Sequence, residues 1–183
     1  MKYIITNSLG EQVALELSGE QAKTIGIPEH MILKHTGYER ERYGGLYWFV
    51  NGSEVIEAPE ECDPIDGEYY DVANYYNRQE LAANVERADR LMRQLRQYAA
   101  LHGGIPSRAD WKDEEGVEKF CIAHQQGYTY DDKDALFVEC YCRECFVGNV
   151  YFLSKEACQR AVEIFRDDLV WYFTEYEAML YED

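Results

Sequence analysis

The sequence predicts an α+β protein of two small lobes, each an antiparallel sheet with one helix packed on it. Two observations lead to this prediction. Both halves of the chain contain short segments in which apolar and polar residues alternate between turn residues, as in antiparallel strands. In each half a segment with a helical repeat follows such strands, at about residues 78–101 and 154–166. The 183 residues, 46% of them hydrophobic, suffice for two small cores.

The first half opens with strands. Residues 3–7 and 12–17 alternate in this way, and Ser18 is placed to cap a short helix after them. Residues 46–57 carry the clearest hairpin signal, because two apolar runs flank Asn51-Gly52. That dipeptide suits a type I′ turn, which needs positive φ at both central residues. After several turn residues the segment 68–76 is expected to form another strand.

The long helix is predicted from about Arg78 to Leu101. Its apolar positions recur at spacings of four and three and therefore share one face: Leu81, Val85, Ala88, Met92, Leu95 and Ala99. Asn77 and Glu80 fit a cap and its capping-box partner, and glycines follow the last turn. We therefore expect an N-terminal lobe at residues 1–101, ending in this helix, and a linker at 102–116.

The C-terminal lobe is expected at residues 117–183, with a βββα order and an aromatic-rich tail. Its strands are predicted at 116–124, 135–142 and 148–152, before a helix that Ser154 caps. This order resembles the first half of the chain, in which strands also precede a helix.

A weak internal repeat supports this comparison. Tyr75-Tyr76-x-x-x-Glu80 aligns with Tyr151-Phe152-x-x-x-Glu156. Each copy is predicted as the end of a strand followed by the start of a helix. Because aromatic pairs at the ends of such elements belong to cores more often than to ligand sites, we expect these rings to pack under the helices.

The net charge of −17 bounds the function. A strongly acidic surface repels nucleic acid and membranes and attracts basic grooves. No apolar run approaches the roughly 20 residues that span a bilayer. The polar residues soon after Met1 are not typical of a signal peptide, so we expect a cytoplasmic protein with mostly reduced cysteines.

The densest acidic segment runs from residue 54 to residue 71 and contains no Lys or Arg. Its eight acids are Glu54, Glu57, Glu60, Glu61, Asp63, Asp66, Glu68 and Asp71. Tyr69 and Tyr70 lie among the last of them and can anchor an interface. These ten residues are the predicted partner-binding surface. The alternative is a solvated loop that only keeps the protein soluble.

The predicted long helix carries a stripe of positive charge. Arg87, Arg90, Arg93 and Arg96 recur every three residues, which forms a slowly winding stripe. This stripe could contact a nucleic-acid backbone. Because the overall charge opposes that contact, we favour pairing with the protein's own acids, such as Glu86, or simple solvation.

The cysteines permit one metal hypothesis. A zinc ion could be bound by Cys121, His124, Cys142 and Cys145. The geometry opposes it, because residues three apart in a strand point to opposite faces. Reduced cysteines in an aromatic core are the favoured alternative, and no cofactor is predicted.

No catalytic pattern stands out. None of the four histidines lies in a known catalytic context, and the glycine pair at 103–104 ends a helix instead of opening a phosphate loop. Carboxylates are so abundant that no pair is singled out. An interaction protein is therefore favoured over an enzyme.

Two segments carry a resemblance to a known group of proteins. Residues 84–96, Asn-Val-Glu-Arg-Ala-Asp-Arg-Leu-Met-Arg-Gln-Leu-Arg, and 148–157, Gly-Asn-Val-Tyr-Phe-Leu-Ser-Lys-Glu-Ala, resemble small acidic proteins of bacteriophages and mobile elements in gut Firmicutes. Some of those proteins are anti-CRISPR inhibitors of the type II RNA-guided nuclease. The similarity extends as a pattern over roughly residues 74–180.

The resemblance implies a phage-type protein acting in the cytoplasm of a host bacterium. It would bind the type II nuclease, with or without guide RNA, through the acidic residues 54–71, and so block DNA recognition or cleavage. Two other hypotheses remain at this point. One is a zinc-stabilised interaction module without nucleic-acid mimicry, and the other is a metal-dependent enzyme of nucleic-acid metabolism.

Overall fold

The structure is a computed structural model of the chain. It describes residues 36–112, 116–125, 135–146 and 148–176 with their side chains, and the backbone of three strands near the start, 2–6, 12–16 and 32–33. The short helix expected after Ser18 and the end of the aromatic-rich tail lie outside the described residues.

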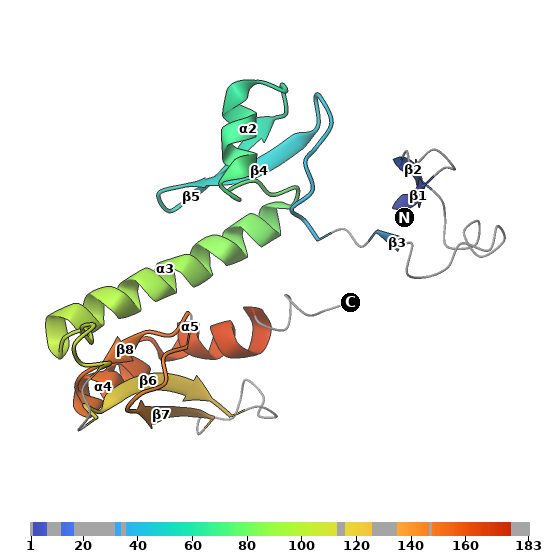
Figure 1. The fold of residues 1–183 in the computed structure, drawn as a ribbon. Helices are drawn as coiled ribbons and strands as arrows, with labels where there is room; N and C mark the ends of the chain where they lie inside the picture. Colours follow the sequence, from blue (N-terminus) through green and yellow to red (C-terminus); the bar gives the residue numbers. More distant parts are fainter. Residues whose placement is uncertain are drawn as a thin grey trace. The chain divides into compact units, whose positions relative to one another are not determined.

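The α+β prediction is confirmed, because the chain contains helices and small antiparallel sheets (Figure 1). The chain divides into two compact units. The first comprises Met1–Phe49 and Ile56–Leu81, and the second comprises Val50–Val55 and Ala82–Glu182. This division differs from the expected lobes 1–101 and 117–183. The long helix packs on the C-terminal sheet, so the second unit begins near its first turn.

Three strands form the N-terminal sheet, as far as the backbone is described. β1 (Lys2–Thr6) pairs antiparallel with β2 (Gln12–Glu16) and with β3 (Ile32–Leu33), in the order β2-β1-β3. The register places Ile4 opposite Ala14. The two strands predicted at the start of the chain are therefore present.

The predicted hairpin is also present, but its turn is not the predicted one. β4 (Leu46–Asn51) and β5 (Glu54–Pro59) form a two-stranded sheet, and Asn51 still belongs to the strand. Gly52 has φ of 67°, whereas neither Asn51 nor Ser53 has positive φ. Positive φ at the first central residue alone fits a type II′ turn on Gly52-Ser53. The prediction of a type I′ turn on Asn51-Gly52 was therefore wrong.

A helix, α2 (Pro64–Asp71), replaces much of the strand expected at 68–76. Its start explains the difference. The Asp63 side chain accepts from the N–H of Ile65 (2.8 Å) and of Asp66 (2.9 Å), and the N–H of Asp63 donates to Asp66 Oδ2 at 3.2 Å. This is a capping box with Pro64 in the first turn, which outweighs the weak strand pattern.

The long helix α3 (Gln79–His102) is confirmed. Its buried face is slightly rotated from the predicted one: Ala82, Glu86, Ala88, Leu91, Leu95 and Ala99 are buried. Leu81, Val85 and Met92 are only half-buried, and their neighbours Ala82, Glu86 and Leu91 are buried instead. One of the replacements, Glu86, is charged, and no apolar pattern could predict it.

The second unit carries a sheet of order β7-β6-β8, made of β6 (Lys119–His124), β7 (Leu136–Tyr141) and β8 (Tyr151–Phe152). α4 (Lys155–Ile164) follows, with Ser154 as its N-cap, and then α5 (Arg166–Trp171) and a π-helical turn, η2 (Tyr172–Tyr176). Both predicted features, the three strands and the Ser154 cap, are confirmed.

One apolar core joins these elements. It is built from buried residues of α3, β6, β8, α4 and α5: Leu91, Leu95, Ala99, Phe120, Phe152, Ala157, Cys158, Ala161 and Leu169. α4 lies against all three strands of the sheet (Figure 1). None of the helices in the described ranges has the length and apolar character needed to cross a bilayer.

The aromatic pairs of the internal repeat lie in cores, as expected. Tyr75 and Tyr76 are 1% and 4% exposed, and Tyr151 and Phe152 are 6% and 0% exposed. Each pair precedes a helix, α3 or α4. Tyr151 and Phe152 form β8, whereas Tyr75 lies outside any strand and Tyr76 pairs with Trp48 only in an isolated bridge. The two copies therefore share buried aromatic pairs ahead of a helix, and the strand end predicted for the first copy was wrong.

Candidate partner-binding surface

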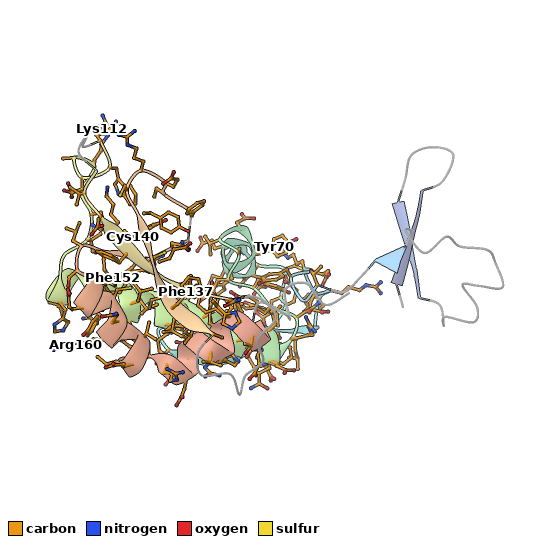
Figure 2. The ribbon with its side chains drawn as sticks, turned by 90° about the horizontal axis from the view of Figure 1, so that it is seen from below. Tyr70, Lys112, Phe137, Cys140, Phe152 and Arg160 are labelled. Carbon is orange, nitrogen blue, oxygen red and sulfur yellow. The ribbon has the colours of Figure 1, made fainter. Side chains whose placement is uncertain are left out.

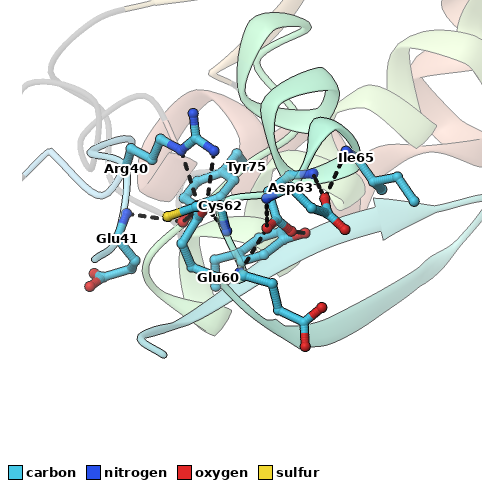
Figure 3. Close-up of polar contacts among 10 residues, drawn as sticks. Arg40, Glu41, Glu60, Cys62, Asp63, Ile65 and Tyr75 are labelled. Atoms are coloured by element: carbon cyan, nitrogen blue, oxygen red, sulfur yellow. Dashed lines mark hydrogen bonds and ion pairs between the residues drawn. The ribbon is translucent and has the colours of Figure 1, made fainter. Parts of the chain in front are cut away.

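The acidic segment folds around a buried carboxylate at the end of β5. Glu60 is fully buried and accepts from Arg40 Nε (3.2 Å) and Nη2 (3.0 Å), from the hydroxyl of Tyr75 (2.8 Å) and from the N–H of Cys62 (3.0 Å). Figure 3 shows these donors converging on one side chain. The ion pair with Arg40 balances the charge that burial would otherwise penalise.

A second buried carboxylate lies at the start of α2. Asp66 is 5% exposed and accepts from the hydroxyl of Tyr47 (2.8 Å) and from the N–H groups of Glu61 (2.8 Å) and Asp63 (3.2 Å). The rings of Tyr47 and Tyr75 stack with centroids 4.1 Å apart. The stacked tyrosines thus donate one hydroxyl to each of the two buried acids.

These contacts shift the pKa values of all four groups. The hydrogen bond from Arg40 lowers the pKa of Glu60, against the opposing effect of burial. Burial raises the pKa of Asp66, but hydrogen bonds from Tyr47 and from two backbone N–H groups outweigh it, and the net shift is downward. Burial, with the neighbouring carboxylates, raises the pKa of both Tyr47 and Tyr75. Both acids are therefore charged, and both phenols protonated, at neutral pH.

The two buried acids correct the predicted surface. Glu60 and Asp66 were expected to face a partner, and they instead hold the loop between β5 and α2 in place. Asp63 is half-buried because it caps α2. The sequence could not separate these acids from their neighbours, since a charged residue on its own predicts exposure.

The remaining acids of the segment are exposed. They are Glu54, Glu57, Glu61, Glu68 and Asp71. We use the name acidic surface for the four that belong to the first unit, Glu57, Glu61, Glu68 and Asp71. Arg40, which lies near this segment in the fold, has its charge engaged by Glu60.

The two tyrosines of the predicted surface have different positions. Tyr69 is half-buried and stacks on Phe49 with centroids 4.2 Å apart. Tyr70, labelled in Figure 2, is 41% exposed. Its ring makes an edge contact with the ring of Tyr75, with centroids 5.6 Å apart. Tyr70 can therefore reach a partner, whereas Tyr69 supports the hairpin.

Sequence reasoning missed two apolar residues on α2 and at its end. Ile65 is 58% exposed and Val72 is 71% exposed. A period of 3.6 places residues 65, 68 and 72 on one face, so Ile65 and Val72 flank Glu68. The signal was hidden because residue 65 was assigned to the turn residues before the expected strand at 68–76, and residue 72 to that strand, so the two were not placed on one helix face.

The arginine stripe pairs within the second unit, as the sequence favoured. Arg87 donates to Asp168 Oδ1 from Nε (3.0 Å) and Nη2 (2.8 Å), and its guanidinium lies 4.0 Å from the ring centroid of Trp171. Arg90 and Arg93 lie 3.3 Å and 3.8 Å from the carboxylate of buried Glu86. These pairings leave three of the four arginines engaged within the protein.

The proposed zinc ligands are not brought together. Cys121 is buried, whereas Cys142 and Cys145 are exposed. His124 stacks on Phe173 with centroids 5.5 Å apart. Within the described ranges no three His, Cys, Asp or Glu side chains form a group that could bind a metal ion. The zinc hypothesis fails because Cys121 and His124 lie on one regular strand and diverge, as strand geometry requires.

Comparisons with known proteins return no relative. No family model, no curated protein and no solved structure matches the chain.

Proposed function

We propose that the protein is an inhibitor that binds a nucleic-acid-processing protein through its acidic surface. The exposed carboxylates take the place of nucleic-acid phosphates in a basic groove, and the groove is thereby blocked. The resemblance of residues 84–96 and 148–157 directs the proposal to the type II RNA-guided nuclease, whose channel for guide and target is strongly positive. The inhibitor would act in the cytoplasm of a bacterial host and would prevent DNA recognition or cleavage.

One observation carries the proposal. The segment 54–71 contains eight acids and no Lys or Arg, yet Glu60 and Asp66 are buried with specific donors. A merely solubilising loop needs no such anchors. The anchors fix the backbone on which the exposed carboxylates stand, so these charges are presented in a defined arrangement, as an interface requires.

The test is binding of the purified protein to a type II nuclease, with and without guide RNA, at two salt concentrations. A variant with Glu57, Glu61, Glu68 and Asp71 changed to Lys should lose binding. The matched control changes four exposed acids of the second unit to Lys: Glu118, Glu144, Glu163 and Glu175. Each variant carries a net charge of −9 instead of −17, so total charge is equal in the two.

The outcomes separate specific from general electrostatics. Loss of binding in the first variant alone, with weaker binding of the wild type at high salt, supports the acidic surface. Equal loss in both variants would mean that only net charge matters. Unchanged binding by the first variant, with its circular dichroism intact, would refute the proposal.

A further inference from the structure

One edge of the sheet in the second unit is open to a further strand. Within the described residues β7 pairs only with β6, because the strand order β7-β6-β8 leaves β7 outermost (Figure 1). An edge strand presents a row of unpaired backbone N–H and C=O groups, which are a template for pairing with another chain. The opposite edge strand, β8, has only two residues, so β7 with six is the longer template.

The register of the β6–β7 pair shows which residues present these groups. In an antiparallel pair, opposite residues alternate between hydrogen-bonded and non-hydrogen-bonded positions. The N–H of Gln125 donates to the carbonyl of Ala135 at 2.9 Å, and these two residues continue the register of the ladder. Counting from this bonded pair, every second residue of β7 directs its N–H and C=O away from β6. The outward residues are Leu136, Val138 and Cys140.

β7 lacks most of the features that protect the edges of natural sheets. Natural edge strands carry Lys or Pro, or they are interrupted by a bulge. The sequence of β7, Leu-Phe-Val-Glu-Cys-Tyr, contains no Pro, Gly, Lys or Arg, and its pairing with β6 is continuous. Phe137, labelled in Figure 2, is 43% exposed although it belongs to a strand. The edge therefore offers both backbone groups and an apolar contact.

Charge decides which kind of strand fits this edge. Glu139 is the one charged residue of β7, and it lies on the same face as Phe137 and Tyr141, since side chains alternate along a strand. A second copy of the chain would bring the same glutamate and a net charge of −17, and the two copies would repel each other. A basic strand would instead be attracted.

We propose that β7 binds an extended segment of a basic partner protein, which adds to the sheet as a further strand. Main-chain hydrogen bonds to the three outward residues supply the pairing, as in other cases of strand addition. On the face of Glu139 the segment places a Lys or Arg beside the carboxylate and apolar side chains beside Phe137 and Tyr141. The proposal concerns the second unit alone and does not depend on the acidic surface.

An NMR titration tests the proposal with one defined probe, the peptide acetyl-Lys-Thr-Val-Thr-Lys-Thr-Val-Thr-Lys-amide. Its Lys and Val side chains share one face of an extended strand, so the central Lys can lie beside Glu139. The amide proton signals of the three outward residues should move downfield and saturate, because their N–H groups gain hydrogen bonds. The signals of the alternate residues, which already bond β6, should move little.

Two control peptides separate strand pairing from general attraction. A peptide with each Val replaced by Pro keeps the charge but cannot pair as a regular strand, and it should not shift the outward amides. A peptide with each Lys replaced by Glu should not bind. Equal shifts with the Pro peptide, or no alternation along β7, would overturn the proposal. Outward amides that respond to protein concentration without any peptide would assign the edge to a second copy and would overturn it as well.

A pair of variants at one exposed position locates the contact. Cys140→Pro removes an outward N–H, which an edge strand tolerates, whereas Cys140→Thr keeps this N–H. Cys140→Pro should bind the Lys peptide about three- to tenfold more weakly than Cys140→Thr, the range for one net hydrogen bond. Equal affinity of the two folded variants would refute pairing at this edge. If Cys140→Pro does not fold, the alternation of amide shifts in the wild type decides.

Discussion

Replacing Glu60 by Gln should destabilise the first unit far more than the same change at its neighbour Glu61. Glu60 is fully buried and receives four donors, two of them from Arg40. A glutamine can accept at only one of its two terminal atoms, and its amide group would face donors. Glu61 has an exposed side chain, and Glu61→Gln is therefore the matched control.

The expected magnitude follows from burial and exposure of the two partners. Removing one partner of a buried ion pair costs about 3–5 kcal/mol. The Arg40 side chain is 38% exposed, and water can solvate its charge after the change. We therefore expect the lower end, about 3 kcal/mol for Glu60→Gln, against at most about 0.5 kcal/mol for Glu61→Gln.

The assay is hydrogen exchange of two backbone amides in the same unit. Trp48 and Tyr76 bond each other across an isolated bridge, at 2.7 Å and 2.9 Å. A loss of about 3 kcal/mol corresponds to exchange faster by roughly 100-fold, since every 1.4 kcal/mol is tenfold. Exchange at these amides that is equally fast in both variants would refute the assigned role of Glu60.

The stability difference between wild type and Glu60→Gln should also depend on pH in a definite direction. The pKa of Glu60 is lowered in the folded protein, from about 4.5 in the unfolded chain. Its contribution is therefore complete above pH 4.5 and declines as the pH falls toward the folded pKa. The difference in stability between wild type and Glu60→Gln should shrink below pH 4.5. A difference that grows on acidification would contradict the assignment.

Further predictions concern backbone, charge and thiols. Gly37 has φ of 91°, and an added Cβ would lie within 2.4 Å of Leu81 Cδ2, so Gly37→Ala should destabilise the first unit by about 1–3 kcal/mol in urea unfolding. Gly44→Ala meets the same φ strain without a neighbour and should cost less. Arg87→Lys should lower stability by about 1 kcal/mol through loss of the two-point contact and of stacking on Trp171. A thiol reagent should titrate the exposed cysteines first and leave two for the denatured protein. The exposed ones are Cys62, Cys140, Cys142 and Cys145, and the protected ones are Cys121 and Cys158. Burial raises the pKa of the protected thiols to about 11 and about 12, respectively. Titration of all six in the native state would contradict the described burial.

Much of the fold could be predicted from local patterns. The hairpin at β4–β5 and the helix α3 follow from turn residues and a regular apolar repeat, which depend on neighbours in the sequence. α2 was missed although Asp63, Pro64 and Asp66 form a cap signature. Gly67 and the aromatic pair at 69–70 pointed away from a helix, and three capping contacts outweighed them.

The candidate surface was harder to predict, because the fate of a carboxylate depends on distant donors. Arg40 reaches Glu60 across 20 residues, and Tyr47 reaches Asp66 across 19. No local pattern encodes such pairs. The sequence offered only an indirect indication that some of the acids are buried, namely the many tyrosines around the acidic segment.

The burial of Glu60 and Asp66 also changes how the acidic segment must be tested. Eight like charges in 18 residues repel one another and oppose a compact loop. Hydrogen bonds to the buried Glu60 and Asp66 offset that repulsion and hold the other carboxylates in place. Substituting all eight acids together would therefore abolish binding by unfolding the loop, whatever the partner contacts. Only variants that keep these two acids can distinguish a binding surface from a folding requirement.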